Sequence, residues 1–164
     1  MPVTDVRQDL EALCLTVTAE FAARPERVWE LYADPRQIER WFGPPTYPAT
    51  FVEHELVAGG RSVYYMTSPE GEKYWGWWET ESATPAEGFV HTDGFGDAEG
   101  RPVDTAPVSR NVVRMGPHGA DGAATQVVVV STYASAADLQ QVLDMGVVEG
   151  LTGSINQIDA LLAG

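Results

Sequence analysis

The sequence predicts an α+β fold in which a curved antiparallel sheet of about six to seven strands wraps around a long C-terminal helix. Short segments of alternating apolar and polar residues fill the middle of the chain, separated by turns rich in Gly and Pro. Two short helical segments follow the first strand, and one helical pattern closes the chain. An antiparallel sheet with one polar face must cover its other face, and only the closing helix is long enough to do so.

Length, composition and charge favour a soluble, single-domain protein. The 164 residues, of which 44% are hydrophobic, suit one domain with a sizeable core. A net charge of −14 argues against nucleic acid and against an anionic membrane surface as partners. The single cysteine, Cys14, excludes an internal disulfide. No apolar run is long enough to cross a membrane and no signal peptide is visible, so the expected location is the cytoplasm.

The first elements follow from local patterns. Residues 1–10 are polar and predict a flexible N-terminal arm, so a single folded domain is expected over residues 11–164. Residues 13–21 alternate between apolar and polar side chains, which is typical of a half-buried strand. Pro25 suits the first turn of a short helix that ends at Asp34-Pro35, and residues 36–41 predict another turn or two of helix.

Strands are expected through the middle of the chain. They cover residues 50–56, 61–67, 73–82, 89–93, 110–115 and 125–133. The segment Ser68-Pro69-Glu70-Gly71 places proline early and glycine late, as a hairpin turn favours. Residues 94–109 are rich in Gly, Pro and Asp and predict a long loop.

One long helix is predicted over residues 136–163, which contain no proline and carry apolar side chains at helical spacing. Ser135 suits its N-cap, and a helix of this length would span ~40 Å. Gly146, Gly150 and Gly153 lie inside the pattern, although each costs about 1 kcal/mol relative to alanine. These glycines indicate a close approach of the sheet, a kink, or space left for another molecule.

Four short motifs occur in a fixed order: Trp41-Phe42-Gly43-Pro44, Gly59-Gly60, Pro69-Glu70-Gly71 and Gly76-Trp77-Trp78. Their order and spacing resemble those of the activator of heat-shock protein 90 ATPase homologue family, in the SRPBCC superfamily of START-like, helix-grip folds. The resemblance covers roughly residues 13–164, and Leu151 stands where the family usually has an aromatic residue. It implies a helix-grip fold with an internal cavity, and it does not fix a reaction.

The predicted cavity lies between the sheet and the closing helix. Because neighbouring residues in a strand alternate faces, Gly76 and Trp78 are expected to point inward together. A mostly apolar wall with a few polar tips suits a small hydrophobic or aromatic ligand. The residues expected to bind this ligand are Trp41, Ser62, Tyr64, Met66, Trp78, Phe89, His91, Met115, Leu143, Met145, Gly146 and Gly150.

His91 and Asp93 are two residues apart on one predicted strand and therefore share a face. They are candidates for a general base with its orienting carboxylate, or for two metal ligands. The preferred interpretation is a polar pair on the solvated face, because two ligands are too few for a structural metal site. His54, between Glu53 and Glu55, is likewise expected to face solvent. Neither a metal nor a cofactor is expected.

Three functions are compatible with the sequence, and binding of a small hydrophobic molecule in the cavity is preferred. The first alternative, suggested by some members of the superfamily, is a cyclase- or hydratase-like enzyme that uses His91, Asp93 or Tyr64 as acid or base. The second is a co-chaperone-like domain acting on a heat-shock ATPase, which is disfavoured because the additional N-terminal domain of chaperone activators is not seen. The resemblance also allows a homodimer.

Overall fold

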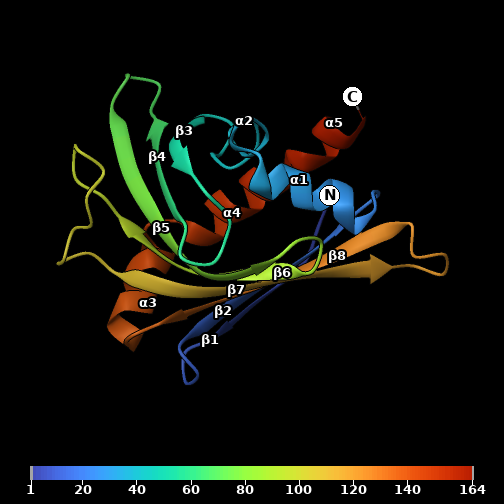
Figure 1. Cartoon of the computed structure of the whole chain (residues 1–164). Helices are drawn as coiled ribbons and strands as arrows, with labels where there is room; N and C mark the ends of the chain where they lie inside the picture. Colours follow the sequence, from blue (N-terminus) through green and yellow to red (C-terminus); the bar gives the residue numbers. More distant parts are fainter. Residues whose placement is uncertain (1, 164) are drawn as a thin grey trace.

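The computed structural model describes residues 2–163, and in this range it places eight strands in one antiparallel sheet. They are β1 (Val3–Asp9), β2 (Cys14–Phe21), β3 (Ala49–His54), β4 (Arg61–Thr67), β5 (Lys73–Thr84), β6 (Gly88–Phe95), β7 (Val108–His118) and β8 (Ala124–Tyr133). In the strand order β1-β2-β8-β7-β6-β5-β4-β3, β2 from the first part of the chain pairs with β8, the last strand. The sheet curves into an open bowl (Figure 1). The predicted α+β architecture is confirmed, with more strands than expected.

Helical segments cover the concave side of this bowl. They are α1 (Pro25–Ala33), α2 (Pro35–Ile38), α3 (Ala136–Asp144), α4 (Val147–Asn156) and α5 (Ile158–Ala163). α1, α2 and α4 lie over the concave face, and α3 lies near the end of β8 (Figure 1). Pro25 occupies the first turn of α1, and the Asp34 carboxylate caps α2 by accepting a hydrogen bond from the Arg36 N–H at 2.9 Å.

The N-terminal segment corrects the expectation of a flexible arm over residues 1–10, because Val3–Asp9 form β1 and pair with β2. The register shifts between Val3 and Asp5, so Val3 pairs with Ala19 and Val6 with Val17. This bulge puts two valines three residues apart on the same face of the strand. Strict alternation does not allow that spacing, and the strand was therefore not visible in the sequence pattern.

The closing segment is not one long helix. α3 ends at Asp144, and Gly146 adopts a left-handed conformation (φ +86°) before α4 begins at Val147. A left-handed residue cannot continue a right-handed helix, and glycine adopts this conformation without a steric penalty. Of the three explanations for the glycines, the kink applies at Gly146. At Gly150 and Gly153, an added Cβ would meet Pro44 and Pro45 only at ordinary contact distance.

The main hydrophobic core fills the bowl between the sheet and the helices. Phe21 from β2, Leu31 from α1, Ile38 from α2 and Ile158 from α5 are each at most 1% exposed. The Trp41 indole N–H donates to the Leu31 carbonyl oxygen at 2.9 Å, so the turn after α2 is tied to α1. This bond places the following residues, including Phe42, over the concave face.

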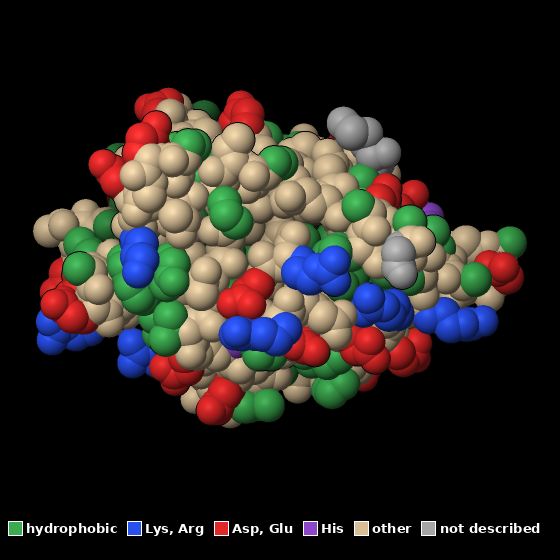
Figure 2. Space-filling model, turned by 90° about the horizontal axis from the view of Figure 1, so that it is seen from above, with side chains coloured by type: hydrophobic (Ala, Val, Ile, Leu, Met, Phe, Trp, Pro, Cys, Tyr) green, Lys and Arg blue, Asp and Glu red, His purple; other side chains and the backbone are tan. Residues whose placement is uncertain are grey.

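The surface is consistent with the composition. Figure 2 shows acidic side chains interspersed with basic ones over one face of the molecule. Within residues 2–163, no helix has both the length and the apolar character needed to cross a membrane.

Candidate functional site

A cavity of about 370 Å³ lies between the concave face of the sheet and the junction of α3 with α4. Its walls are mainly aromatic and aliphatic. Three apolar side chains of this lining are unusually exposed, namely Tyr74 (53%), Phe95 (38%) and Met145 (59%). Because these side chains both line the cavity and reach solvent, they mark its opening.

The cavity brings together most of the residues expected to bind a ligand: Trp41, Tyr64, Met66, Trp78, Phe89, His91, Met145 and Gly146. The other four lie elsewhere. Ser62 is fully buried and Met115 belongs to the main core. Leu143 packs beside Leu139 and Val142, and Gly150 faces Pro44. For all twelve residues, a role in ligand binding stays a prediction.

Aromatic rings form a continuous wall on one side of the cavity. The Phe42 ring lies edge-on to Tyr64 at 5.1 Å and to Trp78 at 5.3 Å between ring centroids. Trp78 stacks on Phe89 at 6.1 Å. Gly76 makes room for Tyr64, because a Cβ at this position would lie 2.4 Å from the phenol ring. Rings in edge-on and stacked contact are held rigidly, so the wall is preformed.

Polar side chains gather at the other side because of strand register. On the concave face, Trp78 of β5 lies opposite Asp93 of β6, which lies opposite Ser109 of β7. In the adjacent row, His91 of β6 lies opposite Asn111 of β7, which lies opposite Ser131 of β8. Directly opposite residues in an antiparallel sheet project from the same face. Four polar side chains from these two neighbouring rows form one group, which we call the polar row: Asp93, Ser109, Asn111 and Ser131.

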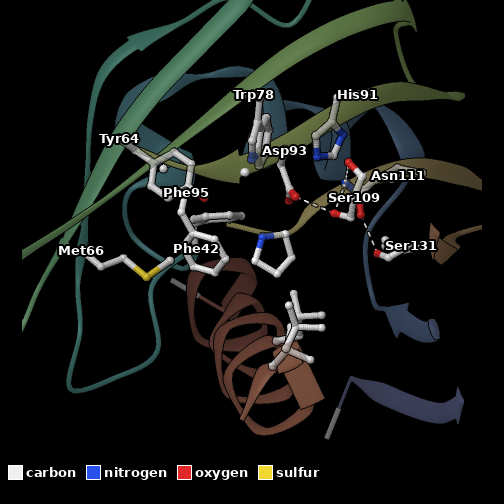
Figure 3. A pocket seen from close by; sticks show the side chains of 18 of the residues that line it. Phe42, Tyr64, Met66, Trp78, His91, Asp93, Phe95, Ser109, Asn111 and Ser131 are labelled. Atoms are coloured by element: carbon white, nitrogen blue, oxygen red, sulfur yellow. Dashed lines mark hydrogen bonds between the residues drawn. The ribbon is translucent and has the colours of Figure 1, made fainter. Parts of the chain in front are cut away.

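Hydrogen bonds run through the polar row in one direction (Figure 3). The Ser131 hydroxyl donates to Asn111 Oδ1 at 2.5 Å, and Asn111 Nδ2 donates to Ser109 Oγ at 3.1 Å. The Ser109 hydroxyl then donates to Asp93 Oδ1 at 2.5 Å. The donors of these three hydrogen bonds therefore all point toward the Asp93 carboxylate. The Asp93 side chain projects into the cavity (Figure 3).

Burial changes the ionisation of both candidate residues. It raises the pKa of Asp93 to about 6, although hydrogen bonds from Ser109 and Asn111 lower it in part. It lowers the pKa of His91 to about 3, with a smaller contribution from nearby His54. His91 is therefore neutral at physiological pH, and its Nδ1 atom has no hydrogen-bond partner within the described chain. The interpretation of His91 and Asp93 as a solvated pair is wrong, because both face the interior.

His54 also departs from its expected place on the surface. Its Nδ1 atom lies 2.7 Å from Ser62 Oγ and its Nε2 atom 2.7 Å from the Tyr32 carbonyl oxygen. The register of β3 shifts between Phe51 and Glu53, and this bulge turns His54 inward beside Phe51. Because its hydroxyl is held by His54, Ser62 lies in the core and does not line the cavity.

No sequence motif pointed to Ser109, Asn111 and Ser131. A signal existed, since Ser109 and Asn111 alternate with Arg110 and Val112 and so take the inward positions of β7. Polar residues at two inward positions of one strand are uncommon enough to indicate a site. Within residues 2–163, no three His, Cys, Asp or Glu side chains lie close enough together to hold a metal ion.

Comparisons with known proteins agree with this architecture. A family model described as Activator of Hsp90 ATPase homolog 1-like protein matches residues 22–163. The crystal structure of protein Ms6760 from Mycobacterium smegmatis is 54% identical, covers 98% of this chain and 97% of that chain, and has a TM-score of 0.89. The solution structure of a protein from Arthrobacter aurescens is 42% identical, with coverages of 98% and 92% and a TM-score of 0.91.

A comparison with curated proteins finds no match. The family model nevertheless extends from the end of β2 to the end of α5, and so includes nearly all the elements that build the cavity. The chain therefore belongs to the family of Activator of Hsp90 ATPase homolog 1-like proteins.

Proposed function

We propose that the protein binds a small aromatic or otherwise apolar molecule in the cavity between the sheet and α3–α4. The observation that carries this proposal is a space of about 370 Å³ walled largely by aromatic rings. A protein interior is normally packed without voids larger than a water molecule, so a preformed apolar space of this size favours a ligand. The exposed Tyr74, Phe95 and Met145 at its opening support the same conclusion, since apolar surface is costly to leave in water.

Binding can be tested by thermal unfolding with two- and three-ring aromatic compounds, fatty alcohols and fatty acids. A ligand present at 100 times its dissociation constant stabilises the native state by about 2.7 kcal/mol, which gives an easily measured rise in Tm. Failure of every aromatic compound and every fatty alcohol to raise Tm would contradict the proposed function.

A cavity-filling variant makes this test specific to the site. Leu151→Phe adds a ring at a residue that lines the cavity, so it is expected to reduce the Tm shift of the best aromatic ligand by at least half. The matched control is Leu10→Phe, at a side chain that is 51% exposed and outside the cavity lining. Equal ligand shifts in Leu151→Phe and in the control would place binding outside the cavity.

A second candidate function is acid–base catalysis in the same cavity, and the buried Asp93 carboxylate favours it. A carboxylate whose pKa is raised to about 6 in an apolar site is a stronger base than one in water. Such a base could remove a proton from the carbon beside a carbonyl group, leaving the electron pair on an enolate oxygen. The proton then returns to carbon from Asp93.

Hydrogen–deuterium exchange tests this second candidate without knowledge of the natural substrate. In D₂O, the wild-type protein is expected to accelerate exchange of the protons beside the carbonyl group of 2-tetralone, because Asp93 exchanges its own proton with solvent between turnovers. Asp93→Asn removes the base and is expected to abolish the acceleration. An acceleration that persists in Asp93→Asn would exclude Asp93 as the base, and NMR measures the rates.

A further inference from the structure

Resting on the proposed function, we propose that the polar row selects a neutral ligand that donates a hydrogen bond, such as a phenol or an alcohol, and that it rejects carboxylates. The first observation concerns charge. Among residues 2–163, those that line the cavity include no Lys or Arg, and Asp93 is their one acidic side chain. His91, the only basic side chain in the lining, is neutral at physiological pH because burial lowers its pKa.

An anionic ligand would therefore meet no compensating charge. Moving a carboxylate from water into an apolar site is costly unless a cation or several donors receive it. Here it would lie beside another carboxylate, and like charges at short range repel strongly where water is excluded. The site thus opposes free fatty acids and other organic anions, although its apolar walls would accept their hydrocarbon parts.

The direction of the hydrogen bonds supplies the second observation. Ser131, Asn111 and Ser109 each direct a donor along the polar row toward Asp93, so none of these bonds is aimed at the cavity. The group that ends the row is an acceptor, the Asp93 carboxylate. A neutral imidazole carries one donor and one acceptor nitrogen, and His91 Nδ1 is buried without a partner among residues 2–163. The Asp93 carboxylate is the one charged acceptor at this end of the cavity lining, and it calls for a donor on the ligand.

Trp78 adds a constraint on the same group of the ligand. Its indole N–H is buried and finds no hydrogen-bond partner in the part of the chain that the structure describes, and Trp78 lies directly opposite Asp93 in the β5–β6 register. The neighbouring Tyr64 hydroxyl comes near this N–H but does not reach hydrogen-bond geometry. A hydroxyl group both donates and accepts, so one hydroxyl beside these side chains satisfies the carboxylate and the indole together. A methyl group in its place satisfies neither.

Three probes of nearly equal shape test the selection: 2-naphthol, 2-methylnaphthalene and 2-naphthoate. At pH 7.5 the wild-type protein is expected to bind 2-naphthol at least about tenfold more tightly than 2-methylnaphthalene, because a hydrogen bond to a charged group is involved. It is expected to bind 2-naphthoate more weakly than either. Dissociation constants come from titrations followed by NMR of the ¹⁵N-labelled protein.

Two variants separate the charge of Asp93 from that of the whole protein. Asp93→Asn keeps a side-chain oxygen but removes the charge, so 2-naphthoate is expected to bind at least about tenfold more tightly than to the wild type. Asp121→Asn removes one charge from the β7–β8 turn, outside the cavity lining, and is expected to change no affinity by more than about twofold.

The outcomes distinguish this inference from the proposed function. Equal binding of all three probes, or no gain for 2-naphthoate in Asp93→Asn, would overturn the selection and leave the binding cavity standing. Absence of binding by every probe, both in the wild type and in Asp93→Asn, would overturn the inference, and together with the failure of every aromatic compound and fatty alcohol to raise Tm it would overturn the proposed function as well. A gain for 2-naphthoate of equal size in Asp121→Asn would assign the rejection to net charge and would also overturn the inference.

Discussion

Replacing Trp78 with alanine is expected to lower the free energy of unfolding by about 3–5 kcal/mol. The Trp78 side chain is 2% exposed and lies at the centre of the aromatic wall. Its ring centroid is 4.3 Å from that of His91, 5.3 Å from that of Phe42 and 6.1 Å from that of Phe89. Alanine would remove these contacts and enlarge a space that already exists, so the surrounding side chains have little means of closing it.

Urea unfolding followed by circular dichroism measures this change. The control is Tyr74→Ala, which removes a large aromatic side chain from the same strand at a position 53% exposed. Its effect is expected to stay within about 0.5 kcal/mol, as for most exposed positions. Similar losses in the two variants would show that the aromatic wall does not depend on Trp78.

Asp93→Asn is expected to stabilise the protein at pH 8, by about 2 kcal/mol, and to have almost no effect at pH 4. The fold raises the pKa of Asp93 from its ordinary value of 3.8 to about 6. Between these values the native state binds more protons than the unfolded state, so this group's contribution to stability falls as pH rises from about 4 to about 6. Each pKa unit corresponds to 1.36 kcal/mol, and we lower the full value because the carboxylate faces a cavity open to water.

Asparagine removes the buried charge and still offers an oxygen to the Ser109 hydroxyl, so the hydrogen-bonded polar row is expected to persist. Urea midpoints of the wild type and Asp93→Asn at pH 4 and pH 8 test the sign, with Asp121→Asn as the control for loss of a surface charge. A loss of stability at pH 8 would mean that the ionised Asp93 stabilises the fold. The expected gain would identify Asp93 as a residue kept at a cost in stability, which is typical of a functional site.

The strand pattern was readable because alternation and turn residues act locally. The segments expected at residues 61–67, 73–82 and 125–133 correspond to β4, β5 and β8. The expectation failed where a bulge changed the alternation. Val3 and Val6 share a face in β1, and Phe51 and His54 do so in β3, because each strand contains one extra residue. A bulge is set by pairing with the neighbouring strand, which a single strand's sequence does not record.

The candidate site, too, was predictable from the sequence only in part. Alternation correctly placed Tyr64 and Met66 on the inward face, and it correctly put His91 and Asp93 on one face, although the solvated face was preferred for that pair. Parity could not tell which inward positions face packed core and which face the cavity, so Met115 was included and Phe42 was not. That distinction depends on where α3 ends and α4 begins above the sheet.

By itself, the sequence determined the α+β class, most of the strands and the acidic, single-cysteine character of the chain. Only the tertiary structure decided that Asp93, Ser109, Asn111 and Ser131, which come from three strands, form one directed row of hydrogen bonds. The physical reason is range. Alternation and helix propensity act between residues a few positions apart, whereas the register that aligns β6, β7 and β8 is fixed by pairing between separate strands, which brings together side chains 16 and 20 positions apart.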